Sequence, residues 1–288
     1  MKNIYRGIFL FIFAWTIIPI MDGIAKYLSQ IGIPVLQIVW ARYFFTCVLV
    51  LPIIIGVYKR NSFKSDNHLL QIFRGSFLVG ATLTFFYAIS IIPLADALAL
   101  AFFYPAFMTL LSHFFLNDKI NFTSVFSVVA GLIGVLFIVK PGFQEFNFAF
   151  LASIGTGLFY ALYMVSTKKL SYVDTPLKTL SFTGLVGLIS MSLMMPFVWV
   201  SPSIYEWFLM LSMGLVASIG HFLIILSFRY VKASILAPFS YWEIITNIII
   251  GYYFFKDIPD KFTWIGIVII IGSGIYILFQ TRNLKYEK

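Results

Sequence analysis

Long runs of apolar residues, each broken by a short polar segment, repeat along the whole chain of 288 residues. Each run is about 20 residues long, the length of an α-helix that crosses a hydrocarbon layer roughly 30 Å thick. The runs are continuous rather than alternating, so helices are expected and barrel strands are not. The breaks carry turn residues, as in "SQIGIP" and "KDIPDK". The pattern predicts ten spans, at residues 7–28, 34–57, 70–91, 94–116, 122–140, 148–169, 177–199, 204–229, 233–255 and 262–281.

The composition agrees with a chain that lies mostly in lipid. Hydrophobic residues make up 61% of the sequence and charged residues only 11%, whereas a soluble domain carries about 25% charged residues. We therefore predict an all-α integral membrane protein. The net charge of +9 suits basic cytoplasmic loops better than nucleic-acid binding. The single cysteine, Cys47, lies in an apolar run and predicts neither a disulfide nor a metal site.

The distribution of Lys and Arg predicts the orientation of the chain. With the N-terminus in the cytoplasm, 15 of the 20 Lys and Arg residues, Arg74 among them, fall in inner segments. Cytoplasmic loops carry an excess of positive charge. We therefore expect a multi-pass membrane protein with both termini in the cytoplasm. The five exceptions are Lys26, Arg42, Lys140, Lys256 and Lys261.

A weak internal repeat divides the chain into two halves of five spans. The segment that begins at Ile92 resembles the segment that begins at Val231. An odd number of spans in each half inverts the second copy, an architecture found in transporters. We expect a first five-helix repeat at 1–141 and a second, inverted one at 142–288. At an offset near 138 residues the matched pairs are Ala95 with Ala233, Asp96 with Ser234, and Tyr104 with Trp242.

Several stretches resemble the drug/metabolite transporter superfamily in its EamA-type branch. They include "FRGSFLVGATLTFFYAISIIPLADALAL", "FFLNDKIN" and "APFSYWEIITNIIIGYYFFKDIPDKFTWIGIVIIIGSG". The last stretch looks most like the subgroup of bacterial S-adenosylmethionine uptake carriers. Many relatives have Glu where this chain has Asp118 and Asp257, and helix-end roles are expected for both. The resemblance implies a carrier of a small metabolite in a bacterial inner membrane and does not fix which metabolite.

Glu243 lies inside the ninth predicted span, about 15 Å deep at 1.5 Å per residue. A carboxylate at that depth costs a few kcal/mol, and intramembrane acids commonly serve function. One interpretation is a protonated Glu that hydrogen-bonds a neighbouring helix. The other, which we favour, is a site for a substrate cation or a proton, facing a central cavity.

Asp22, Lys26 and Arg42 form a second polar group. Asp22 and Lys26 are four residues apart and share a helix face. Arg42 lies at a similar depth, across the short turn between the first two spans. The sequence leaves open whether the group is a structural ion pair, an outer gate, or an anion site in which Arg42 takes a substrate carboxylate.

Aromatic residues at the depth of Glu243 are candidates for contact with an organic cation or a planar ring. His221, in the eighth span, is a further candidate, although a lone buried His is commonly a hydrogen-bonded structural residue. The substrate-binding candidates beside Glu243 are therefore Tyr241, Trp242, Phe103, Tyr104, Tyr87, Tyr160 and His221.

Together these features predict a secondary transporter of a small organic metabolite, such as an amino acid, an amine or a nucleoside-like compound, acting by alternating access. A lipid-modifying membrane enzyme would need polar clusters on its interfacial loops, and these loops are short. An exporter of the same fold is the other alternative. The sequence predicts no cofactor and no metal site. Expected partners are the small-molecule substrate, the lipid bilayer and either protons or an exchanged solute, with the chain a monomer or homodimer.

Overall fold

The computed structural model describes residues 2–104, 147–231 and 242–283, with Leu236, Phe239, Ser240 and scattered residues between 107 and 137. Every element in this described part is a helix, as the apolar pattern predicted. The α-helices are α1 (Lys2–Gln30), α2 (Val35–Tyr58), α3 (His68–Ile91), α4 (Leu94–Ala101), α7 (Phe148–Leu170), α8 (Pro176–Ser192), α9 (Met195–Val198), α10 (Ile204–Tyr230), α12 (Trp242–Ile250) and α13 (Lys261–Asn283). A 3-10 turn, η1 (Lys59–Asn61), follows α2, and a π-helical turn, η3 (Gly251–Phe255), follows α12.

Five of the described helices are long and apolar enough to cross a membrane. They are the segments Ile4–Gln30, Val35–Asn61, His68–Ile91, Phe148–Leu170 and Ile204–Tyr230. Each coincides, within a few residues, with a span predicted from the apolar runs. The structure thus supports the sequence pattern at these five places, while the total of ten spans stays a prediction.

Of the other five predicted spans, the one at 262–281 coincides with α13, and the remaining four are broken or only partly described. The span predicted at 177–199 is divided by a turn between α8 and α9. The span predicted at 94–116 begins as α4 and turns at Phe102 and Phe103. Most of the span predicted at 122–140, with Asp118 before it, lies outside the described residues.

Polar side chains fix several helix starts in ways that the sequence carries locally. Asn67 accepts a hydrogen bond from the Leu70 amide, and Asn147 accepts one from the Ala149 amide. Before α10, the Ser203 hydroxyl accepts from the Glu206 amide at 3.3 Å, and the Glu206 carboxylate accepts from the Ser203 amide at 2.6 Å. This capping box satisfies amides that the first helical turn leaves without partners.

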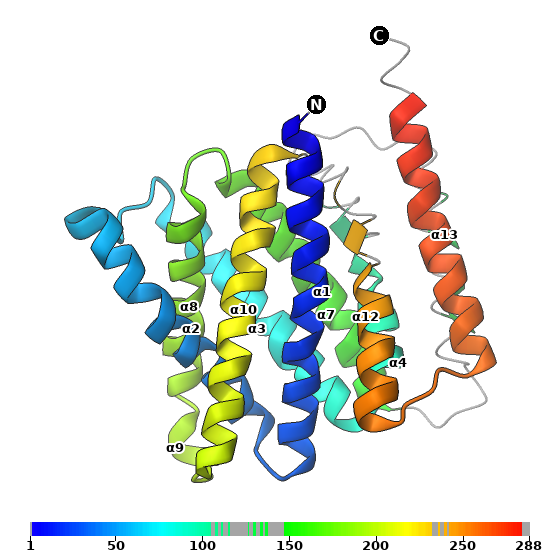
Figure 1. Ribbon diagram of the computed structural model, residues 1–288, viewed down its shortest axis with the longest axis horizontal. Coiled ribbons are helices and arrows are strands. Elements are labelled where there is room, and N and C mark those ends of the chain that lie inside the picture. The colour runs from blue at the N-terminus through cyan, green and yellow to red at the C-terminus, as the bar shows by residue number, and fades with distance from the viewer. Residues whose placement is uncertain are drawn as a thin grey trace.

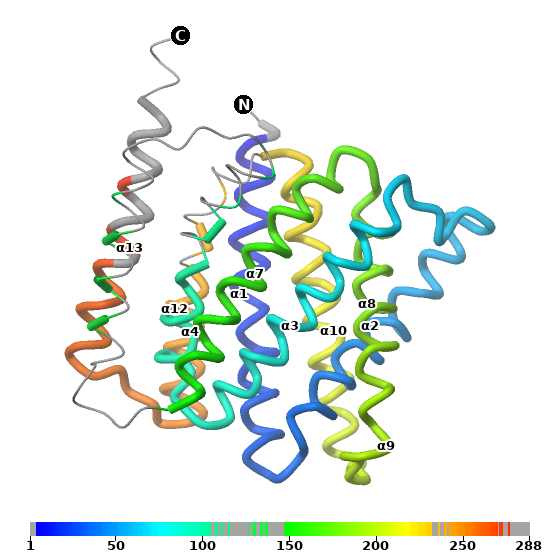
Figure 2. Tube along the Cα trace, turned by 180° about the vertical axis from the view of Figure 1, so that it is seen from behind, coloured from blue at the N-terminus to red at the C-terminus, as the bar shows by residue number. Residues whose placement is uncertain are grey.

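The helices of the two halves of the chain pack against each other in pairs. α1 packs along α10, α3 along α7, and α2 along α8 (Figures 1 and 2). Each of these pairs joins a helix from before residue 105 to one from after residue 146. α1 begins and α13 ends at the same end of the molecule (Figure 1), hereafter the terminal end. The core of the bundle is therefore an interface between the two halves.

Two glycines allow this close approach. A Cβ atom on Gly187 of α8 would lie 2.3 Å from the ring of Tyr43 on α2, and one on Gly220 of α10 would lie 2.5 Å from Ile18 on α1. Contacts this short are impossible for a larger side chain without movement of the helices. Small residues at these crossings let the backbones pack in the way typical of helices in membranes.

Candidate functional site

A cavity of about 550 Å³, counting the space at its mouth, lies between the two halves of the bundle. Its wall comes from seven helical segments, α1, α2, α3, α4, α7, α10 and α12, and from the turn after α4. The polar and aromatic side chains that line it are Trp15, Asp22, Arg42, Thr82, Phe85, Phe86, Phe102, Tyr104, Thr156, Tyr160, His221 and Glu243.

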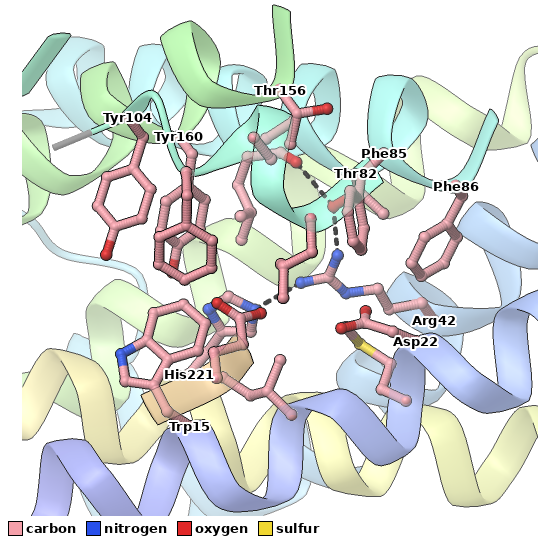
Figure 3. Close-up of a pocket in the computed structure, with 18 residues that line it drawn as sticks. Trp15, Asp22, Arg42, Thr82, Phe85, Phe86, Tyr104, Thr156, Tyr160 and His221 are labelled. Carbon is pink, nitrogen blue, oxygen red and sulfur yellow. Dashed lines mark hydrogen bonds between the residues drawn. The ribbon is translucent and has the colours of Figure 1, made fainter. Parts of the chain in front are cut away.

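One end of the cavity is aromatic. The rings of Trp15 and Tyr160 meet edge to face with centroids 5.9 Å apart, and those of Tyr104 and Tyr160 meet similarly at 5.2 Å. These three side chains gather on one side of the close-up in Figure 3. They come from α1, α7 and the segment after α4, so the aromatic end joins both halves of the chain. Such an arrangement offers ring faces and edges to a planar or cationic group.

The other end is charged and centres on Arg42. The Arg42 guanidinium donates hydrogen bonds to the Thr82 hydroxyl and to His221 Nε2, the latter at 2.6 Å. Asp22 lies beside Arg42 in Figure 3, but the described part of the chain has no ion pair between them within 4 Å. Arg42 thus bonds to a hydroxyl and an imidazole nitrogen rather than to a carboxylate in the described part of the chain. A guanidinium has five N–H donors, and Arg42 uses two of them on these partners.

Several polar atoms of residues that line the cavity have no hydrogen-bond partner among the described residues. They are Asp22 Oδ2, the Trp15 indole Nε1 and the Tyr160 hydroxyl. No hydrogen bond reaches the carboxylate of Glu243 within the described part either, although this residue is only 6% exposed. Buried polar groups are nearly always satisfied, so such a set points to a ligand or to water in the cavity.

The structure brings together six of the residues proposed from sequence. Asp22, Arg42, Tyr104, Tyr160, His221 and Glu243 all line the cavity. Glu243 therefore faces the space between the halves, as expected, rather than lipid.

Four other candidates, Tyr87, Trp242, Phe103 and Lys26, do not line the cavity. Tyr87 and Trp242 are 43% and 42% exposed, and the Trp242 indole donates to Thr16 on the outer side of α1. Phe103 packs against Phe107. These three residues share the depth of the site but point elsewhere, because depth along a helix does not fix the direction of a side chain. Tyr241 lies outside the described residues.

Lys26, the fourth, has a different partner from the one that sequence spacing suggested. Its ammonium lies 2.6 Å from Asp257 Oδ2, the one ion pair among the described residues, and 5.0 Å from the ring of Phe255. Asp257 follows the π-helical turn η3, and its amide donates to the carbonyl of Gly251 at 3.0 Å. The pair therefore joins α1 to the end of η3, and the predicted grouping of Lys26 with Asp22 and Arg42 is not seen.

Sequence reasoning missed the wall that α3 supplies. Leu78, Ala81, Thr82, Phe85 and Phe86 line the cavity at helical spacing. This stripe holds one polar residue among apolar ones, which is the usual pattern of any helix inside a bundle. Trp15 and Thr156 were also missed, for the same reason.

Comparison with known proteins identifies the family. A profile described as the EamA-like transporter family matches residues 5–140 and 147–279. The chain belongs to this family. It is accordingly a multi-pass membrane protein of a transporter family, not an enzyme, which confirms the prediction from the quoted stretches.

The similar proteins include carriers with different named substrates. An S-adenosylmethionine uptake transporter of Rickettsia conorii is 28% identical over 100% of this chain and 98% of its own length. A riboflavin transporter of Vibrio cholerae is 26% identical over 93% of this chain and 92% of its own length. The pseudopaline exporter CntI of Pseudomonas aeruginosa is 31% identical over 66% of this chain and 68% of its own length.

The fold is also seen among solved crystal structures. One of them superposes with a TM-score of 0.71 at 17% identity, and the match covers 96% of this chain and 98% of the other. At that identity the likeness concerns the arrangement of the helices alone.

Proposed function

We propose that this chain is a secondary transporter that takes up a small organic zwitterion with a cationic centre and a planar ring, with S-adenosylmethionine as the leading candidate. One observation carries the proposal: Asp22, Glu243 and Arg42 face one cavity without pairing with each other in the described structure. The curated relatives named for S-adenosylmethionine uptake, at 26–28% identity, support the choice.

The charges of the cavity favour a solute that carries both signs. Asp22 and Glu243 offer carboxylates to a sulfonium or ammonium group, and Arg42 offers unused N–H donors to a carboxylate. Each of these groups is costly to bury without a partner, so a ligand of opposite charge recovers part of that cost on binding.

The aromatic end favours a ring on the same solute. Trp15, Tyr104 and Tyr160 present π faces and edges at that end of the cavity. A heterocyclic base can pack against them while the amino-acid part of the molecule reaches Arg42. Riboflavin, the substrate named for other relatives, carries a ring without a formal charge and leaves the two carboxylates without a cationic partner.

Alternating access is the mechanism that we propose for this fold. The cavity lies at the interface of the two halves, where rocking of one half against the other would expose it to each side in turn. The ten-span, inverted-repeat arrangement and the cytoplasmic termini are parts of this proposal. The energy source that we propose is either exchange for another solute or a proton gradient.

Uptake into proteoliposomes tests the proposal. Purified protein in sealed vesicles should accumulate radiolabelled S-adenosylmethionine faster than empty vesicles do. Unlabelled S-adenosylmethionine should compete strongly, and 5′-methylthioadenosine, which keeps the ring but carries no charge, should compete weakly. Equal competition by the two would mean that the ring alone is recognised, and absence of uptake would refute the substrate assignment.

Export is a second direction that one relative supports, since CntI is named as an exporter. Counterflow distinguishes direction from substrate identity. Vesicles preloaded with unlabelled S-adenosylmethionine should take up the labelled compound by exchange whichever way the protein works in the cell. Uptake into intact cells that express the protein, compared with cells that do not, then establishes the direction.

A further inference from the structure

A continuous chain of hydrogen bonds leads from the cavity into the core of the bundle. Arg42 Nη2 lies 2.6 Å from His221 Nε2, and His221 Nδ1 lies 3.1 Å from the Tyr163 hydroxyl. The Tyr163 hydroxyl in turn accepts from Arg74 Nη2 at 2.9 Å. These residues come from α2, α10, α7 and α3, and all four are buried. Arg42 and His221 line the cavity, whereas Tyr163 and Arg74 do not.

Arg74 anchors the inner end of this chain. Its guanidinium donates to the Thr167 hydroxyl at 2.7 Å, to the Thr179 carbonyl at 3.2 Å and to the Thr183 hydroxyl. Its charged carbon lies 4.4 Å from the centre of the Tyr163 ring. Counting charges had placed Arg74 in an inner segment, but the side chain is fully buried. Bonds to α7 and α8 hold it still, so the Tyr163 oxygen has a fixed donor on one side.

Donor and acceptor chemistry then determines the state of His221. A guanidinium has only donors, so His221 Nε2 must accept from Arg42 and carries no proton. The neutral ring consequently holds its proton on Nδ1, where it donates to the Tyr163 oxygen. In a doubly protonated ring, the N–H of His221 Nε2 would point at an N–H of Arg42 across 2.6 Å, and the two donors would repel each other. The geometry therefore allows one tautomer of His221, and it fixes which atom donates in each hydrogen bond from Arg42 to Arg74.

We propose that His221 is a positioning residue for Arg42, and that Tyr163 and Arg74 act through it from outside the cavity. Bonds to Thr82 and His221 hold the Arg42 guanidinium against α3 and α10, and Asp22 lies beside it (Figure 3). Three of its five N–H donors stay available for a ligand. This inference rests on the proposed function only in assigning a substrate carboxylate to Arg42. It adds that recognition of this carboxylate depends on two residues that no solute touches.

The first test needs no substrate. In protein labelled with ¹⁵N-histidine, the His221 signal, assigned by its loss in His221→Gln, should show the tautomer with the proton on Nδ1. In Tyr163→Phe, modification of Arg42 by phenylglyoxal, followed by mass spectrometry, should become about fivefold faster because one bond that orders the chain is lost. A proton on Nε2, or an unchanged rate of Arg42 modification, would overturn the proposal.

Matched variants separate this role from general loosening of the bundle. Tyr58→Phe removes a tyrosine hydroxyl that bonds Thr175 at 3.0 Å, away from the cavity, and should leave Arg42 modification unchanged. Thr183→Val takes one acceptor from Arg74 and should accelerate the reaction, which keeps the test decisive if Tyr163→Phe does not fold. If Tyr58→Phe accelerates it equally, the effect is global and the positioning role is refuted.

Binding measurements add the functional readout. In Tyr163→Phe the affinity for S-adenosylmethionine should fall about fivefold, while that for decarboxylated S-adenosylmethionine, which lacks the carboxylate, should change less than about twofold. Equal losses for the two compounds would refute a role through Arg42. If the wild-type protein binds neither compound, the substrate assignment fails, and the tautomer and the Arg42 reaction still decide the inference.

Discussion

At the scale of single residues, the buried charges of this bundle are of two kinds. Arg74 makes four hydrogen bonds to fixed partners, so its guanidinium is part of the framework. Asp22 and Glu243 have carboxylate oxygens with no such partners in the described structure. A buried group with all its hydrogen bonds made rigidifies a protein. A buried group without them lowers stability, so its presence points to a functional role. By this criterion Arg74 belongs to the structural framework, and Asp22 and Glu243 belong to the candidate site.

Replacing Glu243 with Gln should abolish transport while preserving the fold. The amide keeps the shape of the side chain but cannot ionise, so attraction to a substrate cation is lost. Uptake should fall by about 30-fold or more, equivalent to ~2 kcal/mol of interaction. Thermal stability in detergent should stay equal or rise, because a costly buried acid is removed.

Variants at Glu243 also separate its two candidate roles. Glu243→Asp should retain part of the activity, since the charge remains but retreats by one methylene. A Gln variant that binds and exchanges substrate but no longer concentrates it would make Glu243 a proton carrier rather than a substrate contact. Normal concentrative transport by the Gln variant would show that the carboxylate is structural.

At the scale of elements, the ends and crossings of helices determine what the site can hold. η3 ends at Phe255. The next residue, Lys256, has a φ of 60° in the left-handed region, and the chain turns there so that Asp257 meets Lys26 of α1. A π-helical turn shifts the helix register, and such turns often occur at functional sites. The resulting Lys26–Asp257 pair joins the end of α1 away from the terminal end to the second half of the chain.

Breaking the pair between Lys26 and Asp257 should loosen that end of the molecule. Lys26→Ala or Asp257→Asn should each lower stability by about 1–3 kcal/mol, a range between exposed and buried pairs, since the side chains are 7% and 23% exposed. The exchange Lys26→Asp with Asp257→Lys should recover part of the loss. Thermal unfolding in detergent measures both effects, and a double exchange no better than the worse single change would contradict a specific pair.

The close crossing of α2 and α8 depends on glycine at position 187, which has no side chain. Gly187→Ala would place a methyl group 2.3 Å from the buried Tyr43 ring and should destabilise the protein by about 1–3 kcal/mol. Gly155→Ala, where nothing lies within 4 Å of the added atom, is the matched control and should cause little change. A melting temperature equally insensitive to both substitutions would mean that the helices move apart at little cost.

At the scale of the whole molecule, the site is a property of the interface between the halves. The pairs α1 with α10, α3 with α7, and α2 with α8 each cross that interface. Trp15 and Arg42 belong to the first half, and Tyr160, His221 and Glu243 to the second. Neither half contains the cavity alone, so under the proposed alternating access a movement of one half against the other would change access and binding together.

Topology reporters test the orientation of the chain in the membrane, which the alternating-access proposal assumes. Fusions after Asn61 and after Lys288 should both report the cytoplasm, and a fusion after Pro202 should report the outside. The excess of Lys and Arg in the predicted inner segments gives the reason. An external fusion after Lys288 would contradict both the ten-span prediction and the inverted repeat.

The sequence by itself determined the class of the molecule and most of its long helices. Apolar runs of about 20 residues are sufficient for this, because lipid requires every backbone polar group to be bonded within the segment. The sequence also identified Glu243, Arg42 and Asp22, since a charge within an apolar run is conspicuous and expensive.

The tertiary structure decided which of these groups meet. Lys26 pairs with Asp257, 231 residues away, rather than with its helical neighbour, and Trp242 faces outward while Tyr160 faces the cavity. Spacing along one helix fixes which residues share a face, but the face that packs inward depends on the other helices. The chain from Arg42 through His221 and Tyr163 to Arg74 joins four helices, so only their packing creates it.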